Sequence, residues 1–310
     1  MLPQKLTIAL LSGGNSSERK ISLASGIAVE QALDKKKFII KKYDPAKDLP
    51  RLVLDCKKID IAFLALHGSG GEDGVIQGFL ESLNIPYTGS GVRSSALAMD
   101  KILSRQIYQN AGLNIAPAQT LKRGEKINLT QLKKLGFPLI IKPATEGSSI
   151  GIEIVQSSAT LQHALKKVLL LSEKILIEKF LKGVEITVGV LEKSNKKLIA
   201  LPPVEIVPKR KFFDLQAKYD PKLCDEICPA RLSKQLIAQA QELALKAHEA
   251  LDCRGVSRTD MILIKNKFFL LETNTLPGLT KNSLLPKAAQ VYGLSFSELC
   301  EQLIKTALDN

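Results

Sequence analysis

Tryptophan is absent from this sequence of 310 residues, and tyrosine and phenylalanine keep the aromatic share at only 5%. Single-stranded nucleic acids are commonly bound by stacking their bases on aromatic side chains, so this scarcity, with no recognisable nucleic-acid-binding motif, argues against such a partner. No apolar run approaches the roughly 20 residues that a membrane-spanning helix needs, so we expect no membrane association. The five cysteines lack CxxC spacing, which predicts free thiols in a reducing compartment.

The amino-terminal segment also lacks the pattern of a secretory signal peptide. Its apolar stretch, residues 6–11, is short and leads to Gly13 and Gly14 without a convincing cleavage site. We therefore interpret this stretch as a buried strand and expect a cytoplasmic protein.

Positive charge, in contrast, is abundant. Lysine and arginine number 44 against 31 acidic residues, which gives a formal net charge of +13 at pH 7. The lysines form small groups, such as 35–37 and 133–134, and are not focused on one element. This pattern favours a solvated basic surface that attracts a phosphate-bearing small molecule. A basic nucleic-acid-binding protein is the alternative from a different class, and steep loss of DNA affinity with rising salt would identify it.

Strands that alternate with helices up to about residue 97 predict an open, mainly parallel α/β domain. The first strand leads into GGNSSERKISLASG, a helix start in which Glu18 either binds a ligand or complements the helix dipole; the residues alone favour the dipole. A second strand, residues 59–66, runs into HGSGGEDG, and ligands of open α/β sheets gather at such strand ends. His67 in this loop belongs to a binding loop or is satisfied within a tight turn.

The phrase GFPLIIKPATEGSSIG, residues 136–151, joins a buried strand that ends at Lys142 to a loop of glycine and serine. Lys142 can supply a point charge for phosphate, and the amides and hydroxyls of residues 147–149 can surround phosphate oxygens. The spacing is not that of a P-loop, so a different nucleotide-binding fold is required, and a plain hairpin turn is the alternative. Residues 212–229 form a long loop-like stretch, and active-site lids are one use of such loops.

The remaining elements follow from hydrophobic periodicity. Helices are expected over residues 75–83, 160–171, 232–251 and 295–308, with a further helix that carries Met99, Asp100 and Lys101. Strands are expected over residues 175–181 and 185–192.

Residues 258–279, RTDMILIKNKFFLLETNTLPGL, concentrate charge within what otherwise resembles two buried strands. The polar residues 265–267 separate MILI from FFLLE, which predicts an antiparallel hairpin. We expect Ile264 to pair with Phe268 across the turn. Because residues two apart on a strand share a face, this register places four polar side chains on one face of the sheet: Arg258, Asp260, Glu272 and Asn274.

In this arrangement Asp260 directly faces Glu272, and two opposed carboxylates repel each other. A divalent cation held by both carboxylates and by the amide oxygen of Asn274 would remove the repulsion, and oxygen ligands of this kind suit magnesium. A hairpin whose charges simply face water is the alternative, because a register slip of one residue would separate the carboxylates.

Nine phrases in order along nearly the whole chain resemble the D-alanine:D-alanine ligase family of the ATP-grasp superfamily: GGNSSERKISLASG, ALHGSGGEDG, YTGSG, MDK, IIKPATEGSSIG, LIEKFL, FFDLQAKY, RTD and LLETNTLPGLT. The resemblance implies an α/β fold, α+β in the ATP-grasp unit, with an N-terminal open parallel domain (residues 1–97), a central ATP-grasp subdomain (98–182) and a C-terminal catalytic domain (183–310). It implies ATP-dependent joining of two D-alanines through an acyl phosphate, for peptidoglycan precursor synthesis.

The resemblance also implies roles for individual residues. The residues implied in catalysis are Glu18, Ser148, Tyr219, Arg258 and Gly278. Those implied in substrate binding are His67, Ser283 and Leu284. Those implied in nucleotide binding are Lys101, Lys142, Glu146, Gly147, Ser148, Ser149, Glu178, Glu185 and Lys218. Those implied as metal ligands are Asp260, Glu272 and Asn274, which hold Mg²⁺ or Mn²⁺, with two ions expected.

The same resemblance implies D-alanine and ATP as binding partners and a homodimeric assembly. The chain departs from many relatives at Phe213 and Leu215, where tyrosines are usual, and at Leu276, where serine is usual. The stretch Ala217-Lys218-Tyr219 favours an amine as second substrate. A related ligase that uses D-lactate or D-serine as second substrate is the alternative.

Overall fold

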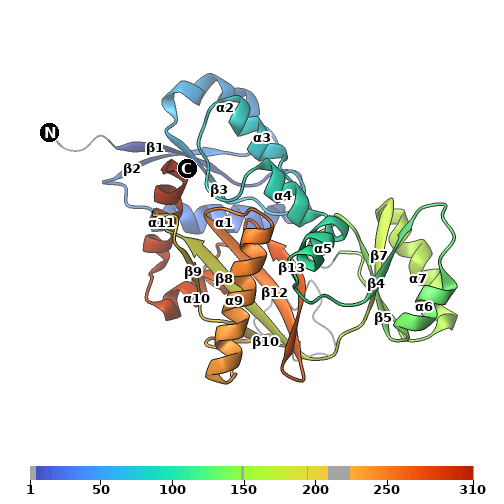
Figure 1. The fold of residues 1–310 in the computed structure, drawn as a ribbon. Coiled ribbons are helices and arrows are strands. Elements are labelled where there is room, and N and C mark those ends of the chain that lie inside the picture. The colour runs from blue at the N-terminus through green and yellow to red at the C-terminus, as the bar shows by residue number, and fades with distance from the viewer. Residues whose placement is uncertain (1–4, 148–149, 194, 209–223, 310) are drawn as a thin grey trace.

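The computed structural model describes residues 5–147, 150–193, 195–208 and 224–309, and three β-sheets organise this part of the chain (Figure 1). The first sheet is parallel, with the strand order β2-β1-β3. Its strands are β1 (Leu6–Leu11), β2 (Phe38–Tyr43) and β3 (Ile61–Leu64). The accompanying helices are α1 (Arg19–Ala32), α2 (Leu49–Asp55), the short 3-10 helix η1 (Cys56–Lys58), α3 (Val75–Ser82) and α4 (Val92–Met99). The expected open parallel domain and its first strand are confirmed.

The second sheet is antiparallel and has the strand order β4-β7-β5-β6. Its strands are β4 (Ala118–Lys122), β5 (Leu139–Pro143), β6 (Glu153–Val155) and β7 (Lys174–Lys179). The neighbouring helices are α5 (Lys101–Asn110), α6 (Leu129–Leu135) and α7 (Ser158–Leu171). Leucines of α6 and α7 pack with β5 and β7 into a separate core, and Figure 1 shows this unit at one end of the molecule.

The third sheet is also antiparallel, with the order β11-β10-β8-β12-β13 and β9 paired to β8. Its strands are β8 (Val184–Glu192), β9 (Leu198–Ala200), β10 (Val204–Pro208), β11 (Cys224–Ile227), β12 (Val256–Ile264) and β13 (Lys267–Asn274). Its helices are α9 (Lys234–Ala250), α10 (Leu284–Tyr292) and α11 (Phe296–Leu308). Among the described helices, none is long and apolar enough to cross a bilayer.

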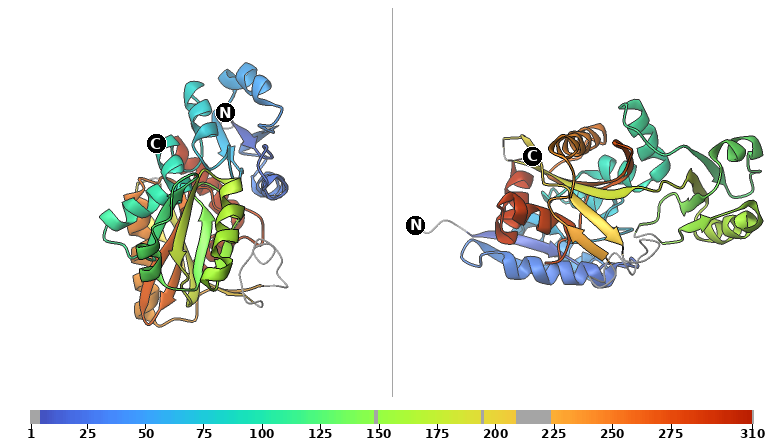
Figure 2. Two further views of the ribbon diagram at one scale, coloured as in Figure 1. Left: turned by 90° about the vertical axis from the view of Figure 1, so that its right-hand side faces the viewer. Right: turned by 90° about the horizontal axis from the view of Figure 1, so that it is seen from below.

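Strand alternation gives the third sheet two different faces. Ile186, Val188 and Val190 of β8 point into the core beneath α9, whereas Thr187 between them bonds to Asp260 on the opposite face. The view from below in Figure 2 shows α9 on one side of this sheet and α1 on the other. The charged face is therefore the one turned toward the N-terminal domain.

The first and third sheets share a hydrophobic core. Ile8 and Phe63 of the first sheet pack with Leu191 and Val256 of the third, together with Leu285 of α10. All five side chains are nearly or completely buried. This continuous apolar contact fixes the carboxyl ends of β1 and β3 beside the charged face of the third sheet.

Two expectations about local structure are wrong. The helix expected through Asp100 is broken there, because the Asp100 side chain accepts hydrogen bonds from the backbone N–H groups of Ile102 and Leu103 and so caps a new helix, α5. The stretch expected to be a loop contains a strand, β11, which pairs with β10. Residues 212–223 of that stretch lie outside the described residues.

Candidate active site

A cavity of about 650 Å³ lies where the charged face of the third sheet meets the first domain. The structure brings many of the residues singled out from the sequence to its lining: Glu18, His67, Lys101, Gly147, Glu185, Arg258, Asp260, Glu272, Asn274, Gly278, Ser283 and Leu284. They come from elements that are far apart in sequence, so the cavity exists only in the folded chain.

The hairpin of β12 and β13 supplies the floor of the cavity, and its important pairs are as expected. Arg258 pairs with Asn274, and Asp260 pairs with Glu272. The expected pairing at the turn is wrong, because Ile264 pairs with Lys267 and the register shifts between Asp260 and Met261. A β-bulge at that point takes up the additional residue of β13, so the charged pairs still face each other.

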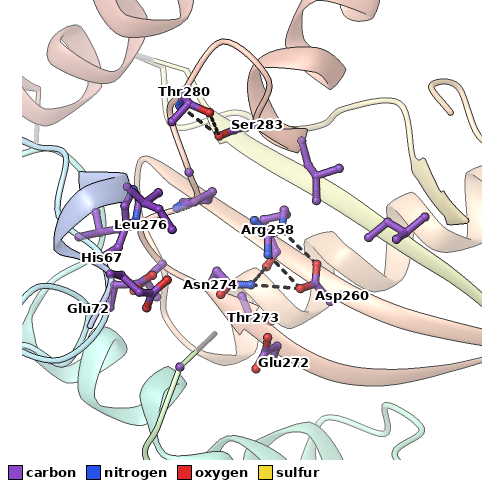
Figure 3. A pocket seen from close by; sticks show the side chains of 18 of the residues that line it. His67, Glu72, Arg258, Asp260, Glu272, Thr273, Asn274, Leu276, Thr280 and Ser283 are labelled. Carbon is purple, nitrogen blue, oxygen red and sulfur yellow. Dashed lines mark hydrogen bonds and ion pairs between the residues drawn. The ribbon is translucent and has the colours of Figure 1, made fainter. Parts of the chain in front are cut away.

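Asp260 is the most heavily bonded carboxylate of the floor. Arg258 donates to both of its oxygens, from Nε and Nη2, at 3.0 Å each. Thr187 Oγ1 donates to Oδ1 at 2.5 Å, and Asn274 Nδ2 donates to Oδ2 at 3.3 Å. Figure 3 shows Arg258, Asp260 and Asn274 joined in this way, with Glu272 beside them. Burial alone would lower the pKa of Arg258, but the facing carboxylates raise it above its ordinary value, so the guanidinium stays charged.

Asp260, Glu272 and Asn274 present oxygen atoms on one face of the sheet, which is the donor set that a hard divalent cation prefers. No group of three or more His, Cys, Asp or Glu side chains suited to a metal occurs among the described residues. The floor therefore offers two carboxylates and an amide, and further oxygen ligands for an ion would have to come from a bound molecule such as a phosphate.

A second cluster of charged side chains lies on α5 and on the strands beside it. Lys142 on β5 contacts Glu178 on β7 at 2.5 Å, and Arg105 on α5 contacts the other oxygen of Glu178, also at 2.5 Å. Lys101 donates to the carbonyl oxygen of Glu146 at 2.5 Å and lies 3.9 Å from a carboxylate oxygen of Glu272. Every cation of this group is at most 8% exposed. Lys101, Arg105 and Lys142 are thus three buried cations that share only a few carboxylates. An anionic ligand bound near them would offset their positive charge.

Arg105 was not singled out from the sequence. It stands four residues after Lys101 on α5, and residues four apart on a helix share a face, so that spacing was the available signal. Lys101 lines the cavity, whereas neither Lys142 nor Glu178 is among the residues that line it.

The N-terminal domain closes the opposite side of the cavity. Glu18 is 7% exposed, and one of its oxygens lies so near Gly147 that a Cβ atom there would stand 3.2 Å away. His67 Nε2 is 3.0 Å from Ser25 Oγ, and burial lowers the pKa of its ring despite the nearby Glu18 carboxylate. The contact with Gly147 places Glu18 beside the loop that was expected to hold phosphate, and His67 lines the same cavity.

Glu72 is a second residue that was not singled out, although it lies within the HGSGGEDG phrase. Its carboxylate accepts the backbone N–H of Gly68 at 2.7 Å and lines the cavity (Figure 3). Burial, and then the nearby Glu18 carboxylate, raise the pKa of Glu72 from 4.5 to about 8. The signal in the sequence was its place in the loop, but its burial could not be inferred without the fold.

The N-terminus of α10 forms another wall. Ser283 occupies the N-cap position of this helix without a side-chain capping bond, and its Oγ accepts the backbone N–H of Thr280 at 3.1 Å and lies 2.8 Å from Thr280 Oγ1. Gly278 packs against the same hydroxyl, because a Cβ atom there would stand 2.9 Å from Ser283 Oγ. The backbone of Gly278 and the first turn of α10 are thereby held at the edge of the cavity. Several residues singled out from the sequence lie outside the described residues: Ser148, Ser149, Lys218 and Tyr219.

One antiparallel sheet carries a carboxylate pair on the floor of a cavity, and a second carries a buried lysine–glutamate pair; together with the parallel α/β domain they define a protein of the ATP-grasp class. Family models described as D-ala D-ala ligase N-terminus and D-ala D-ala ligase C-terminus match residues 50–90 and 107–305. The chain belongs to the D-alanine–D-alanine ligase family.

Individual relatives agree with this assignment. The chain is 53% identical over 313 aligned positions to a D-alanine–D-alanine ligase of Syntrophobacter fumaroxidans, with all of both chains covered. The crystal structure of D-alanine–D-alanine ligase from Bacillus anthracis complexed with ATP has a TM-score of 0.86 and 35% identity, and covers 98% of this chain and 97% of that one. The VanG D-Ala:D-Ser ligase from Enterococcus faecalis has a TM-score of 0.84 and 30% identity, with 98% of this chain and 100% of that one covered.

Proposed function

We propose that this protein joins two D-alanines into D-alanyl-D-alanine with hydrolysis of ATP to ADP and phosphate, in the cytoplasm, for peptidoglycan precursor synthesis. The observation that carries the proposal is the single cavity that unites Glu18, the Asp260–Glu272 pair and the N-terminus of α10, with the buried cations beside it. Membership of the ligase family over the full chain supports it.

A carboxylate is a poor electrophile, and transfer of the γ-phosphoryl group to one carboxylate oxygen of the first D-alanine gives it a leaving group. The amine of the second D-alanine, after loss of a proton, attacks the acyl carbon, and the C–O bond to phosphate then breaks. The acyl phosphate would hydrolyse in water, and we assign its protection to the cavity together with residues 212–220 as a closing segment.

We assign the phosphate oxygens of ATP to the cations at one end of the site. Lys101 and Lys142 supply charge there, and the loop of residues 146–149 supplies backbone amides and hydroxyls. Glu178 and Glu185 are assigned to the adenine and ribose. Lys218 is assigned to the nucleotide as well.

The floor of the cavity is assigned to the metal and the oxyanion. Asp260, Glu272 and Asn274 would hold Mg²⁺ or Mn²⁺, with two ions proposed per site, and the ions would supply positive charge to the transferring phosphoryl group. Arg258 and the backbone N–H of Gly278 stabilise the oxyanion that forms when the amine attacks.

The remaining walls are assigned to the amino acids. Glu18, with His67 nearby, binds the ammonium of the first D-alanine, and Ser148 and Tyr219 link Glu18 to the closing segment. Ser283 and Leu284 bind the carboxylate of the second D-alanine at the start of α10. We further propose domain boundaries after residues 97 and 182, and a homodimer.

The test is ADP release in the presence of magnesium with D-alanine, with L-alanine and with no amino acid. The proposal expects stimulation by D-alanine and formation of the dipeptide. If D-alanine gives no stimulation over the sample without amino acid, the proposal is wrong.

A ligase that uses D-serine as second substrate is the second candidate, and the structural likeness to the VanG D-Ala:D-Ser ligase favours it. D-Lactate, the hydroxy acid that corresponds to D-alanine, is a further alternative as second substrate. Competition between D-alanine, D-serine and D-lactate as acceptors, followed by product analysis across pH, separates these activities. Salt-sensitive DNA binding without ATP turnover would instead indicate a nucleic-acid-binding protein.

A further inference from the structure

The turn between β1 and α1 sets the position of Glu18. Gly13 and Gly14 lie in this turn with φ values of +101° and +78°, a conformation that side chains other than glycine rarely adopt. Glu18 occupies the N-cap position of α1 but makes no side-chain capping hydrogen bond. The start of α1 therefore depends on contacts from outside the helix.

Asp44, the first residue after β2, supplies such contacts together with Arg19. Its Oδ1 accepts the backbone N–H of Gly14 at 2.9 Å, and its two oxygens accept Nη1 and Nη2 of Arg19 at 3.0 and 2.5 Å. Arg19 Nη1 also donates to the carbonyl oxygen of Gly14 at 2.7 Å. One ion pair thus holds both backbone polar groups of Gly14.

Asp44 is packed tightly into the turn, whereas the Arg19 side chain is 40% exposed. Asp44 is 8% exposed, and a Cβ atom on Gly13 would stand 2.6 Å from its Oδ1, so the carboxylate packs directly against the glycine. The hydrogen bonds from Arg19 are the main reason why the pKa of Asp44 falls to about 2, although burial opposes them. The carboxylate therefore remains charged across the physiological pH range.

Glu18 is held between two anchors. Arg19 follows it directly and bonds to Asp44, while Ser16 Oγ accepts the backbone N–H of Glu18 at 3.2 Å and donates to the carbonyl oxygen of His67 at 2.6 Å. Consecutive residues at a helix start point about 100° apart, so Arg19 can reach Asp44 while Glu18 points into the cavity. Neither Asp44 nor Arg19 is among the described residues that line the cavity.

We propose that the Asp44–Arg19 pair is a positioning element that fixes Glu18 and thereby sets the affinity of the site for the ammonium group of the first amino acid. The inference rests on the proposed function, in which Glu18 binds that ammonium. Asp44 and Arg19 act through Glu18 and do not touch substrate.

The test compares Asp44→Asn with Glu30→Gln. Asp44→Asn preserves the size of the side chain but removes its charge. Glu30→Gln breaks the ion pair between Glu30 and Lys42, which also joins α1 to β2 but is exposed and remote from the turn. We expect Asp44→Asn to raise the KM for the first D-alanine at least about tenfold, or about 1.4 kcal/mol, with little change in the KM for ATP. Glu30→Gln should change neither KM.

Arg19→Lys is the second variant, in case Asp44→Asn does not fold. It leaves Asp44 bonded to Gly14 and removes only the paired hydrogen bonds from Nη1 and Nη2 of the guanidinium. It should raise the KM for D-alanine by a smaller factor at an unchanged Tm. An unchanged KM for D-alanine in both variants would overturn the inference. Parallel loss of D-alanine and ATP affinity with a lowered Tm would also overturn it, since that result indicates a purely structural role. Absence of D-alanine-stimulated ADP release in the unaltered protein would refute the proposed function itself.

Discussion

The substitution Glu272→Gln separates the proposed metal role of the hairpin from its structural role. Glutamine preserves the size and one oxygen of the side chain, and the pairing of residue 272 with Asp260 uses backbone groups. Lys101 Nζ lies 3.9 Å from the Glu272 carboxylate, and the Glu272 side chain is 27% exposed. At that distance the contact is too long for a hydrogen bond, and Lys101 keeps its bond to the carbonyl oxygen of Glu146, so loss of the contact should cost about 1 kcal/mol and is offset by relief of the repulsion between the two carboxylates.

The effect on turnover should be much larger. An ion that neutralises the transferring phosphoryl group stabilises the transition state by several kcal/mol, so loss of one ligand of that ion should slow the reaction. We expect kcat/KM to fall at least about a hundredfold, which corresponds to about 2.7 kcal/mol, while Tm changes by no more than about 4 °C.

The assay is D-alanine-dependent ADP release over a magnesium titration, with Tm measured on the same samples. Glu173→Gln is the matched control, because it breaks an exposed ion pair with Lys122 at 3.3 Å outside the cavity. Loss of activity should be greatest at low magnesium in Glu272→Gln and absent in the control. Turnover equal to that of the unaltered protein in a folded Glu272→Gln variant would refute the metal assignment.

Three further predictions concern other parts of the structure. Because the pKa of Glu72 is raised from 4.5 to about 8, the folded state keeps a proton in this pH range that the unfolded state has lost, so stability decreases as pH rises from 4.5 to 8. Glu72→Gln should therefore flatten the dependence of Tm on pH between those values. An unchanged slope would contradict the raised pKa of this group. Gly278→Ala places a Cβ atom 2.9 Å from Ser283 Oγ; the KM for the second D-alanine should rise about tenfold with an unchanged KM for ATP, and equal changes in both would argue against a local effect. Ser295→Ala removes the capping box that Ser295 forms with Glu298 on α11; unfolding should become easier by about 1 kcal/mol at unchanged kcat, as chemical denaturation and ADP release would show.

The hairpin shows how far the sequence can be interpreted. Alternation along two apolar runs predicted that Asp260 faces Glu272, and the structure has that pair. The prediction started from a wrong pairing at the turn, where Lys265 and Asn266 adopt φ values of +46° and +63° in a two-residue turn. The bulge after Asp260 compensates for the difference, and no pattern of apolar and polar residues revealed it.

Residues whose importance depends on burial were harder to find. Arg105 looks like an ordinary helix residue until α5 packs beside β7 and brings it to Glu178. Asp44 follows an edge strand of the first sheet, and only the parallel pairing of β2 with β1 places it against the glycine turn. Contacts of this kind arise from tertiary packing, whereas strands, loops and their order follow from local pattern.

The network around Asp260 connects the proposed metal and oxyanion roles of the floor. A carboxylate has about four lone-pair positions, and Asp260 receives four donors: two from Arg258, one from Thr187 and one from Asn274. A cation that binds this carboxylate must therefore replace at least one donor. The longest of the four bonds, at 3.3 Å, is the one from the Asn274 amide. Rotation of the Asn274 amide would free one oxygen of Asp260 and turn the Asn274 carbonyl oxygen toward the same space. Asn274 would then change from a hydrogen-bond donor that occupies Asp260 to an oxygen ligand of the cation.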